Sequence, residues 1–146
     1  MTSSSTSTNL NIVVDTNQFL SVFVFHGKLM RLVFDLVIDE KIHLYVSPPL
    51  KDEIQEKLQF FAVSKEGQKE VLSFIEDNSI IVEPTISIDV CRDKEDNFAL
   101  ELAEASQADY LITRDKDLLT LKNWKQTGII KPENFLPLLR KMKLID

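Results

Sequence analysis

Short apolar runs along the chain alternate with longer segments in which apolar residues recur every three or four positions. Runs of this length that are rich in β-branched residues and stop at polar residues or proline are typical of strands buried on both faces. The runs that we interpret as strands are 11–14, 42–47, 80–82, 110–113 and 128–131. We expect the last of these to be an edge strand.

The segments between the predicted strands carry an apolar stripe at helical spacing. The predicted helices are 17–25, 28–39, 49–60, 64–77, 97–107 and 132–143, with a short helical turn from Asp117. No internal repeat interrupts this order of strand and helix. The alternation predicts an α/β fold of three layers, α/β/α, with a central parallel sheet.

Length and composition indicate a single domain without a membrane segment. The chain has 146 residues, of which 44% are hydrophobic and 27% charged, which is ordinary for one globular domain. We interpret the Ser/Thr-rich residues 1–10 as a disordered leader and 11–146 as the domain. The apolar runs are shorter than the roughly 20 residues of a membrane span, and the leader lacks a signal core. We therefore expect a cytoplasmic protein.

The net charge, the glycine positions and the single cysteine limit the kinds of site that the chain can form. A net charge of −6, from 17 basic and 23 acidic residues, disfavours broad electrostatic adhesion to nucleic acid. It does not exclude a nuclease, because cations held by clustered acids reverse the local field. The 3 glycines form no phosphate-binding loop. The single cysteine, Cys91, excludes an internal disulfide.

Four acidic residues are predicted to lie at one edge of the sheet. Asp15 and Asp115 follow predicted strands, Asp96 lies at a helix start, and Glu53 lies in the first turn of a helix. Ligands of open α/β sheets gather beyond the carboxyl ends of the strands. Clustered carboxylates repel one another unless they are protonated or neutralised, and Mg²⁺ or Mn²⁺ prefers oxygen ligands. The structural alternative is that the acids only cap helices or face solvent.

Four segments of the chain together resemble the PIN-domain family, in particular its toxin components of toxin–antitoxin pairs. They are VVDTN (13–17), SPPLKDEIQEKL (47–58), DKEDNFALELA (93–103) and ADYLITRDKDLL (108–119). The resemblance runs from about Asn11 to the C-terminal helix. It implies a PIN-like fold and a Mg²⁺- or Mn²⁺-dependent endoribonuclease that cleaves RNA. A cognate antitoxin and a homodimer are further expectations from the family.

The resemblance also implies roles for particular residues. It places the metal-binding and catalytic roles on Asp15, Glu53, Asp96 and Asp115. Thr113 matches a small hydroxyl residue that would orient ligands or bound water, and Asn17 closes the first segment and is expected to support the site.

Three further residues near these segments leave alternatives open. Asp93 competes with Asp96, and Asp117 could supplement Asp115. Arg114 stands where many relatives have glycine, so it could bind phosphate or pair with Asp93, and we assign it no role.

Two other functions are compatible with parts of the sequence. A degenerate PIN-like module that binds RNA or protein without turnover would keep the fold, but the presence of all four acids argues against it. A phosphatase of the haloacid dehalogenase type would use Asp15 after the first strand. That chemistry needs a second acid two positions later, where this chain has Asn17.

Overall fold

A six-stranded sheet forms the centre of the computed structural model, which describes residues 10–146. Its strand order is β3-β2-β1-β4-β6-β5. The strands are β1 (Asn11–Val14), β2 (His43–Val46), β3 (Ser79–Ile81), β4 (Tyr110–Ile112), β5 (Asn123–Trp124) and β6 (Thr127–Ile130). Five of them run parallel, and β5 alone pairs antiparallel with β6. The predicted α/β class with a central parallel sheet is confirmed.

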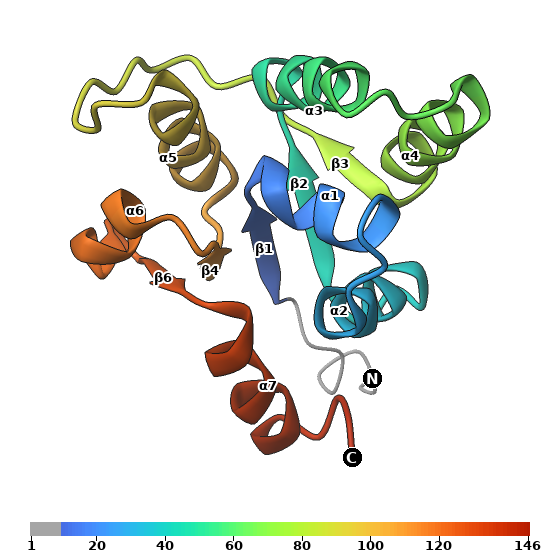
Figure 1. Cartoon of the computed structure of the whole chain (residues 1–146). Helices are drawn as coiled ribbons and strands as arrows, with labels where there is room; N and C mark the ends of the chain where they lie inside the picture. The colour runs from blue at the N-terminus through green and yellow to red at the C-terminus, as the bar shows by residue number, and fades with distance from the viewer. Residues whose placement is uncertain (1–9) are drawn as a thin grey trace.

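Helices cover both faces of the sheet (Figure 1). They are α1 (Thr16–Phe23), α2 (Lys28–Ile38), α3 (Pro48–Phe60), α4 (Lys65–Asn78), α5 (Lys94–Ser106), α6 (Lys116–Leu121) and α7 (Pro132–Lys141). Helix α1 packs against α2, α3 and α4. Helix α5 packs over β1, β2 and β4. The three-layer arrangement confirms the predicted architecture.

The register of the two central strands positions the residues that follow them. Ile12, Val13 and Val14 of β1 are completely buried, because helices cover both sides of the strand. Val14 pairs with Ile112 of β4, and the Asp15 amide continues this pairing by donating to the Ile112 carbonyl at 3.3 Å. The residues just beyond β1 and β4 therefore emerge side by side.

Helix α5 begins earlier than the sequence pattern predicts. We predicted its start at Asn97, whereas the helix begins at Lys94 with Asp93 as its N-cap. The apolar stripe starts only at Phe98, so hydrophobic periodicity does not reveal the polar first turn. Acids in a first turn meet the positive end of the helix dipole favourably. Asp96 thus lies inside the first turn of α5.

The prediction that 128–131 is an edge strand is wrong. β6 lies between β4 and the short strand β5, which occupies the edge. The β5–β6 turn contains Lys125 with φ 55°. Residues with positive φ in hairpin turns are usually glycine or asparagine, so this turn carries none of the usual sequence signals.

Two further expectations concern the predicted leader and membrane-spanning segments. The leader predicted for residues 1–10 falls outside the described residues except for Leu10, which is buried against the core. Within 10–146, no helix combines the length and apolar character that crossing a membrane requires.

Candidate active site

Asp15 and Asp115 occupy the carboxyl ends of the neighbouring strands β1 and β4, and each caps the helix that follows. Asp15 accepts a hydrogen bond from the amide of Gln18 at the start of α1. Asp115 accepts from the amides of Asp117, at 2.9 Å, and Leu118 through its Oδ1 atom. Both strand-end acids therefore cap helices, as the structural alternative expects. Because Asp115 caps with Oδ1 only, its second oxygen is left for another partner.

Thr113 joins the two strand-end acids. Its side chain is completely buried. The Thr113 hydroxyl donates a hydrogen bond to Oδ2 of Asp15, and the Thr113 Oγ1 atom accepts one from the Asp115 amide at 2.9 Å. One hydroxyl thus fixes both the Asp15 carboxylate and the turn that carries Asp115. A buried threonine on a strand can serve packing alone, but these two bonds connect Thr113 directly to both acids.

Glu53 and Asp96 approach the same place from two different helices. Glu53 lies on α3 and is 9% exposed, and Asp96 lies on α5 and is 7% exposed. The Thr16 hydroxyl donates to Glu53 Oε1. The buried Oδ2 atom of Asp96 has no hydrogen-bond partner within residues 10–146.

One pocket contains all four of the acids that the sequence analysis singled out. Asp15, Glu53, Asp96 and Asp115 line it together with Asp93 and Glu95, and its remaining lining residues are Thr16, Asn17, Leu50 and Lys57. The structure therefore brings the four acids together from β1, α3, α5 and the β4–α6 turn. It also places the exposed Asn17 and Asp93 at the same pocket.

Burial and mutual repulsion favour the protonated forms of the pocket carboxyls. Burial raises the pKa of Asp15, against the hydrogen bonds from Thr113 and Gln18. Burial also raises the pKa of Glu53 to about 7, opposed by the bond from Thr16. The pKa of Asp96 rises to about 7 because it is buried and faces the Asp115 carboxylate.

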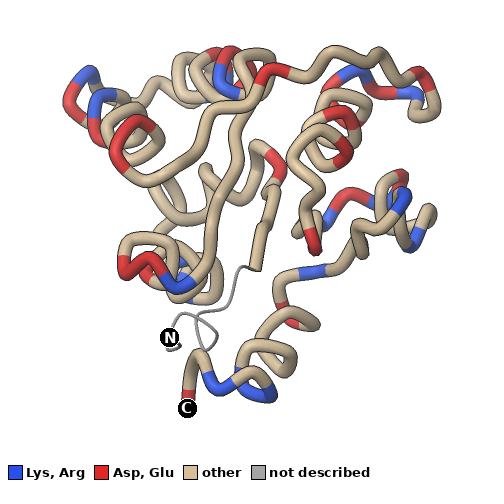
Figure 2. The backbone as a smooth tube through the Cα atoms, turned by 180° about the vertical axis from the view of Figure 1, so that it is seen from behind, with Lys and Arg blue, Asp and Glu red and all other residues tan. Residues whose placement is uncertain are grey.

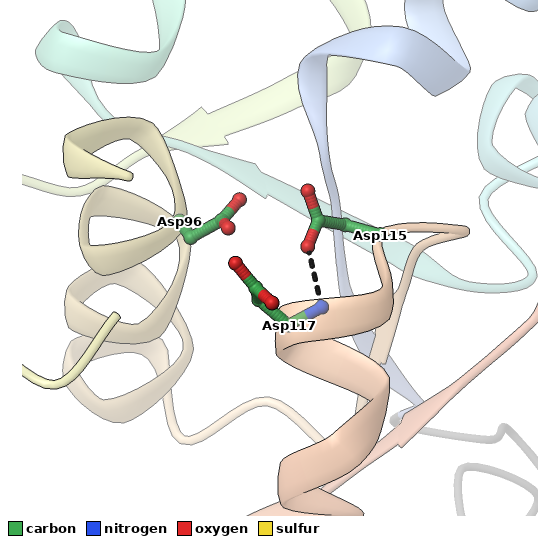
Figure 3. A group of neighbouring side chains, drawn as sticks. All are labelled: Asp96, Asp115 and Asp117. Atoms are coloured by element: carbon green, nitrogen blue, oxygen red, sulfur yellow. Dashed lines mark hydrogen bonds between the residues drawn. The ribbon is translucent and has the colours of Figure 1, made fainter. Parts of the chain in front are cut away.

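Asp117 lies close to the pocket but has a different environment. Carboxylate oxygens of Asp96, Asp115 and Asp117 lie within 4.8 Å of one another, and Figure 3 shows the three side chains converging. Asp117 also forms a salt bridge with Arg92 at 3.0 Å, and the guanidinium engages both of its oxygens. The charge of Asp117 is thus already compensated, unlike that of Asp96.

The donor set fits a hard divalent cation. Carboxylate oxygens are the ligands that Mg²⁺ and Mn²⁺ prefer, and the pocket gathers them from four separate elements. The orphaned Oδ2 of Asp96 is an independent indication, because a buried polar atom without a partner is costly. A cation bound there would satisfy this atom and offset the repulsion between Asp96 and Asp115.

Several pocket residues escaped the sequence analysis. Thr16 lies directly after the strand-end acid Asp15, and this place is the signal that could have identified it. Lys57 carries no sequence signal that points to the pocket, and Glu95 could be recognised only as one of several polar residues at a helix start. Arg114 pairs with Glu133 of α7 at 2.6 Å, so the suggested pairing with Asp93 is wrong. The two partners come from segments that no sequence spacing connects.

Comparison with known proteins identifies the family. A model of the PIN domain matches residues 11–117, which include all four pocket acids. The uncharacterized protein MJ1680 of Methanocaldococcus jannaschii is 32% identical over 119 residues, covering 78% of this chain and 76% of that protein.

Two solved structures share the fold at low sequence identity. VapBC2 from Rickettsia felis, bound to a DNA fragment from their promoter, gives a TM-score of 0.60 at 13% identity, covering 82% of this chain and 97% of the other. PAE2754 from Pyrobaculum aerophilum gives 0.56 at 19% identity, covering 90% of each chain. At these identities the likeness is one of fold. On the strength of the family match, the chain belongs to the PIN-domain family.

Proposed function

We propose that this protein is a divalent-cation-dependent endoribonuclease that hydrolyses RNA phosphodiesters, and that it is the toxin of a toxin–antitoxin pair. PIN domains are generally nucleases, and the family match covers the segments that carry the acids. The single observation that carries the proposal is the convergence of Asp15, Glu53, Asp96 and Asp115 on one pocket. A degenerate binding module would have no need to retain all four.

In the proposed mechanism, Asp15, Glu53, Asp96 and Asp115 hold Mg²⁺ or Mn²⁺. The bound cation supplies Lewis acidity toward the phosphodiester and toward water. The protein's own contribution is orientation. Thr113 holds Asp15 and the Asp115 turn in place, and Thr16 holds Glu53. Asp117 and Asp93 lie at the rim and are proposed only as supplementary contacts.

The carboxyls also set the proton balance of the proposed site. Without a cation, Glu53 and Asp96 are each only partly ionised near neutral pH, because both have a pKa of about 7. Cation binding requires the ionised forms and therefore releases protons. We expect activity to rise with pH through about 7 and to level off above it.

A cognate antitoxin is part of the proposal. It is supported by the fold shared with VapBC2 from Rickettsia felis and by the resemblance to PIN-domain toxins. A cytoplasmic location and a homodimer belong to the same proposal. The expected inhibitor is a small protein that covers the acidic pocket.

Cleavage of a labelled single-stranded RNA tests the proposal. We expect the purified protein to cleave with Mn²⁺ or Mg²⁺ and not with EDTA, and Asp15→Asn and Asp96→Asn to lose cleavage while they keep the wild-type circular dichroism spectrum. Expression of the wild type alone should arrest growth, and expression of either variant should not. A folded wild type that binds the cation but cleaves no RNA would support the binding-module alternative.

A further inference from the structure

A groove leads out of the acidic pocket along one face of α3. Glu53, Lys57 and Phe60 are spaced i, i+4 and i+7 on this helix, so they lie in one row. Four residues line both the acidic pocket and the adjoining groove: Asn17, Glu53, Lys57 and Glu95. The groove is completed by Glu56, Phe60 and Phe61. The pocket and the groove are therefore continuous.

Exposed aromatic rings form the far end of the groove. Phe60 is 80% exposed and Phe61 is 43% exposed. Phe25, which follows α1, is 60% exposed and lies beside the groove without lining it. The rings of Phe60 and Phe61 meet edge to face with centroids 5.2 Å apart, and Phe25 meets Phe61 in the same way at 5.5 Å. Single exposed apolar residues need no explanation. Here Phe61 contacts both Phe60 and Phe25, and the three rings form a platform beside the acidic pocket that could receive a flat ligand.

Lys57 separates the acidic pocket from this aromatic platform. It is the cation that lines the pocket and the groove, and none of the salt bridges found within residues 10–146 involves it. The helix rise places Lys57 about 6 Å and Phe60 about 10 Å beyond Glu53 along the α3 axis. The order along the groove is acid cluster, ammonium, aromatic ring.

We propose that this groove binds one side of a single-stranded RNA, with a phosphate next to the scissile one at Lys57 and a base stacked on Phe60 and Phe61. The inference rests on the proposed function and specifies its substrate as unpaired RNA. The order of groups matches a scissile phosphate at the cation, a second phosphate, and then a base. Bases in a duplex are stacked on one another and are not free to reach the rings.

The position of the rings favours RNA over a protein segment as the occupant. Stable protein interfaces bury about 800 Å² on each partner, far more than three clustered rings provide. The groove also opens directly onto the site of the proposed reaction, where part of the substrate must lie. Stacking tolerates any base, so we expect this groove to set the requirement for a single strand without setting a sequence.

The test compares Phe60→Ala with the wild type on two RNA probes. One is a single-stranded decamer, and the other is a dinucleotide, which offers the scissile phosphate but no phosphate for Lys57. Removing one stacking ring costs about 1–3 kcal/mol, so we expect kcat/KM for the decamer to fall by about 5- to 150-fold, mainly through KM. The dinucleotide should be cleaved as by wild type, and Phe60→Trp should restore the decamer.

Matched variants separate the loss of base stacking from a loss of stability of the fold. Phe60 is mostly exposed, so we expect its loss to leave the melting temperature unchanged. Ile38→Ala removes another exposed apolar side chain, 48% exposed, from the distant helix α2 and should leave cleavage of both substrates unaffected. Lys57→Gln should weaken decamer binding and reduce its salt dependence. The decamer annealed to its complement should be a poor substrate for every variant.

Binding measured without turnover keeps this inference separate from the proposed function. Fluorescence anisotropy of the labelled decamer with Asp96→Asn, with and without Phe60→Ala, reports the groove even if no RNA is cleaved. Equal affinity of the two proteins overturns the inference, and so does an equal loss of kcat/KM on the dinucleotide. If Phe60→Ala lost binding to a protein partner but kept its affinity for the decamer, the rings would be assigned to protein docking. That result would also overturn the inference. Failure of the wild type to cleave any RNA counts against the proposed function alone.

Discussion

The acids of the pocket and the acids of its rim show how position decides the behaviour of a carboxyl group. At the rim, Glu133 pairs with Arg114, which holds the pKa of Glu133 below its usual value. Inside the pocket, burial raises the pKa values of Glu53 and Asp96 to about 7. Asp117 and Glu133 have arginine partners, whereas the pocket acids face one another. Within residues 10–146, the pocket therefore gathers six carboxyl groups with Lys57 as the one lining cation, so most of their charge is not neutralised by the fold.

Overall acidity would not have distinguished these regions. Acidic positions are spread over most helices and loops of the chain (Figure 2). What separates the pocket acids is their attachment to strand ends and helix starts that meet at one edge of the sheet. The following predictions test this difference.

The largest expected effect separates two adjacent acids on α3. Glu53→Gln should reduce RNA cleavage by at least about 100-fold, in the range found for the loss of one group that stabilises a transition state. Asp52→Asn should leave cleavage unchanged, because Asp52 is exposed and lies outside the pocket. Initial rates at saturating Mn²⁺ measure both variants. Equal rates for the two would remove the distinction between pocket and surface acids.

This pair also shows how far the sequence predicts the site. Strand ends and helix starts were sufficient to expect Asp15 and Asp115 at one edge, because parallel strands align their carboxyl ends. The burial of Glu53 was not predictable, since on α3 it borders the apolar stripe, where the sequence pattern favours solvent exposure. Its buried position depends on the contacts of α3 with α1 and α5, which only the folded chain defines.

The sequence likewise predicted most of the fold but not all of it. Hydrophobic periodicity located the parallel strands and most helices. It missed β5, which has only two residues and a hairpin turn with Lys125 at positive φ in place of glycine or asparagine. The ring platform was missed because nothing in the local pattern shows that Phe25 and Phe61 come into contact.

A smaller effect is expected from the hydroxyl that joins the two strand-end acids. Thr113→Val keeps the shape of the side chain but leaves the half-buried Asp115 amide and the Asp15 carboxylate without this partner. We expect unfolding free energy to fall by about 1–3 kcal/mol and cleavage to fall with it. Thr113→Ser, which retains the hydroxyl, should recover activity. Urea denaturation and initial rates measure the two effects, and full activity in Thr113→Val would show that this link is dispensable.

The raised pKa values predict how stability depends on pH in the metal-free protein. Burial and the neighbouring Asp115 carboxylate raise the pKa of Asp96 from the ordinary aspartate value of 3.8 to about 7 in the folded chain, so the folded state binds the proton more tightly. The resulting stabilisation is complete below about pH 4 and is lost as pH rises through about 7.

We therefore expect the melting temperature of the metal-free wild type to fall by about 3 °C or more between pH 5.5 and 8. Asp96→Asn should show a shallower fall, because its amide does not titrate. Scanning calorimetry in EDTA measures both curves. Parallel curves for the two proteins would show that Asp96 does not have the raised pKa.

The smallest effect is expected at the rim. Arg114→Gln removes the salt bridge to Glu133, in which both side chains are about half exposed. Exposed ion pairs contribute about 0–1 kcal/mol, so we expect a change in unfolding free energy of less than about 1 kcal/mol. Denaturation at low and high salt measures it. A loss comparable to that of Thr113→Val would mean that the rim is as important to stability as the pocket.

Titration of the metal-free protein with Mn²⁺ by isothermal calorimetry at pH 7 is the most direct test of the claim that the pocket is built for a cation. We predict saturable binding with proton release for the wild type and for Asp52→Asn, and binding at least about 10-fold weaker for Asp96→Asn. A folded wild type that takes up no Mn²⁺, or an Asp96→Asn variant that binds it equally well, would contradict the account.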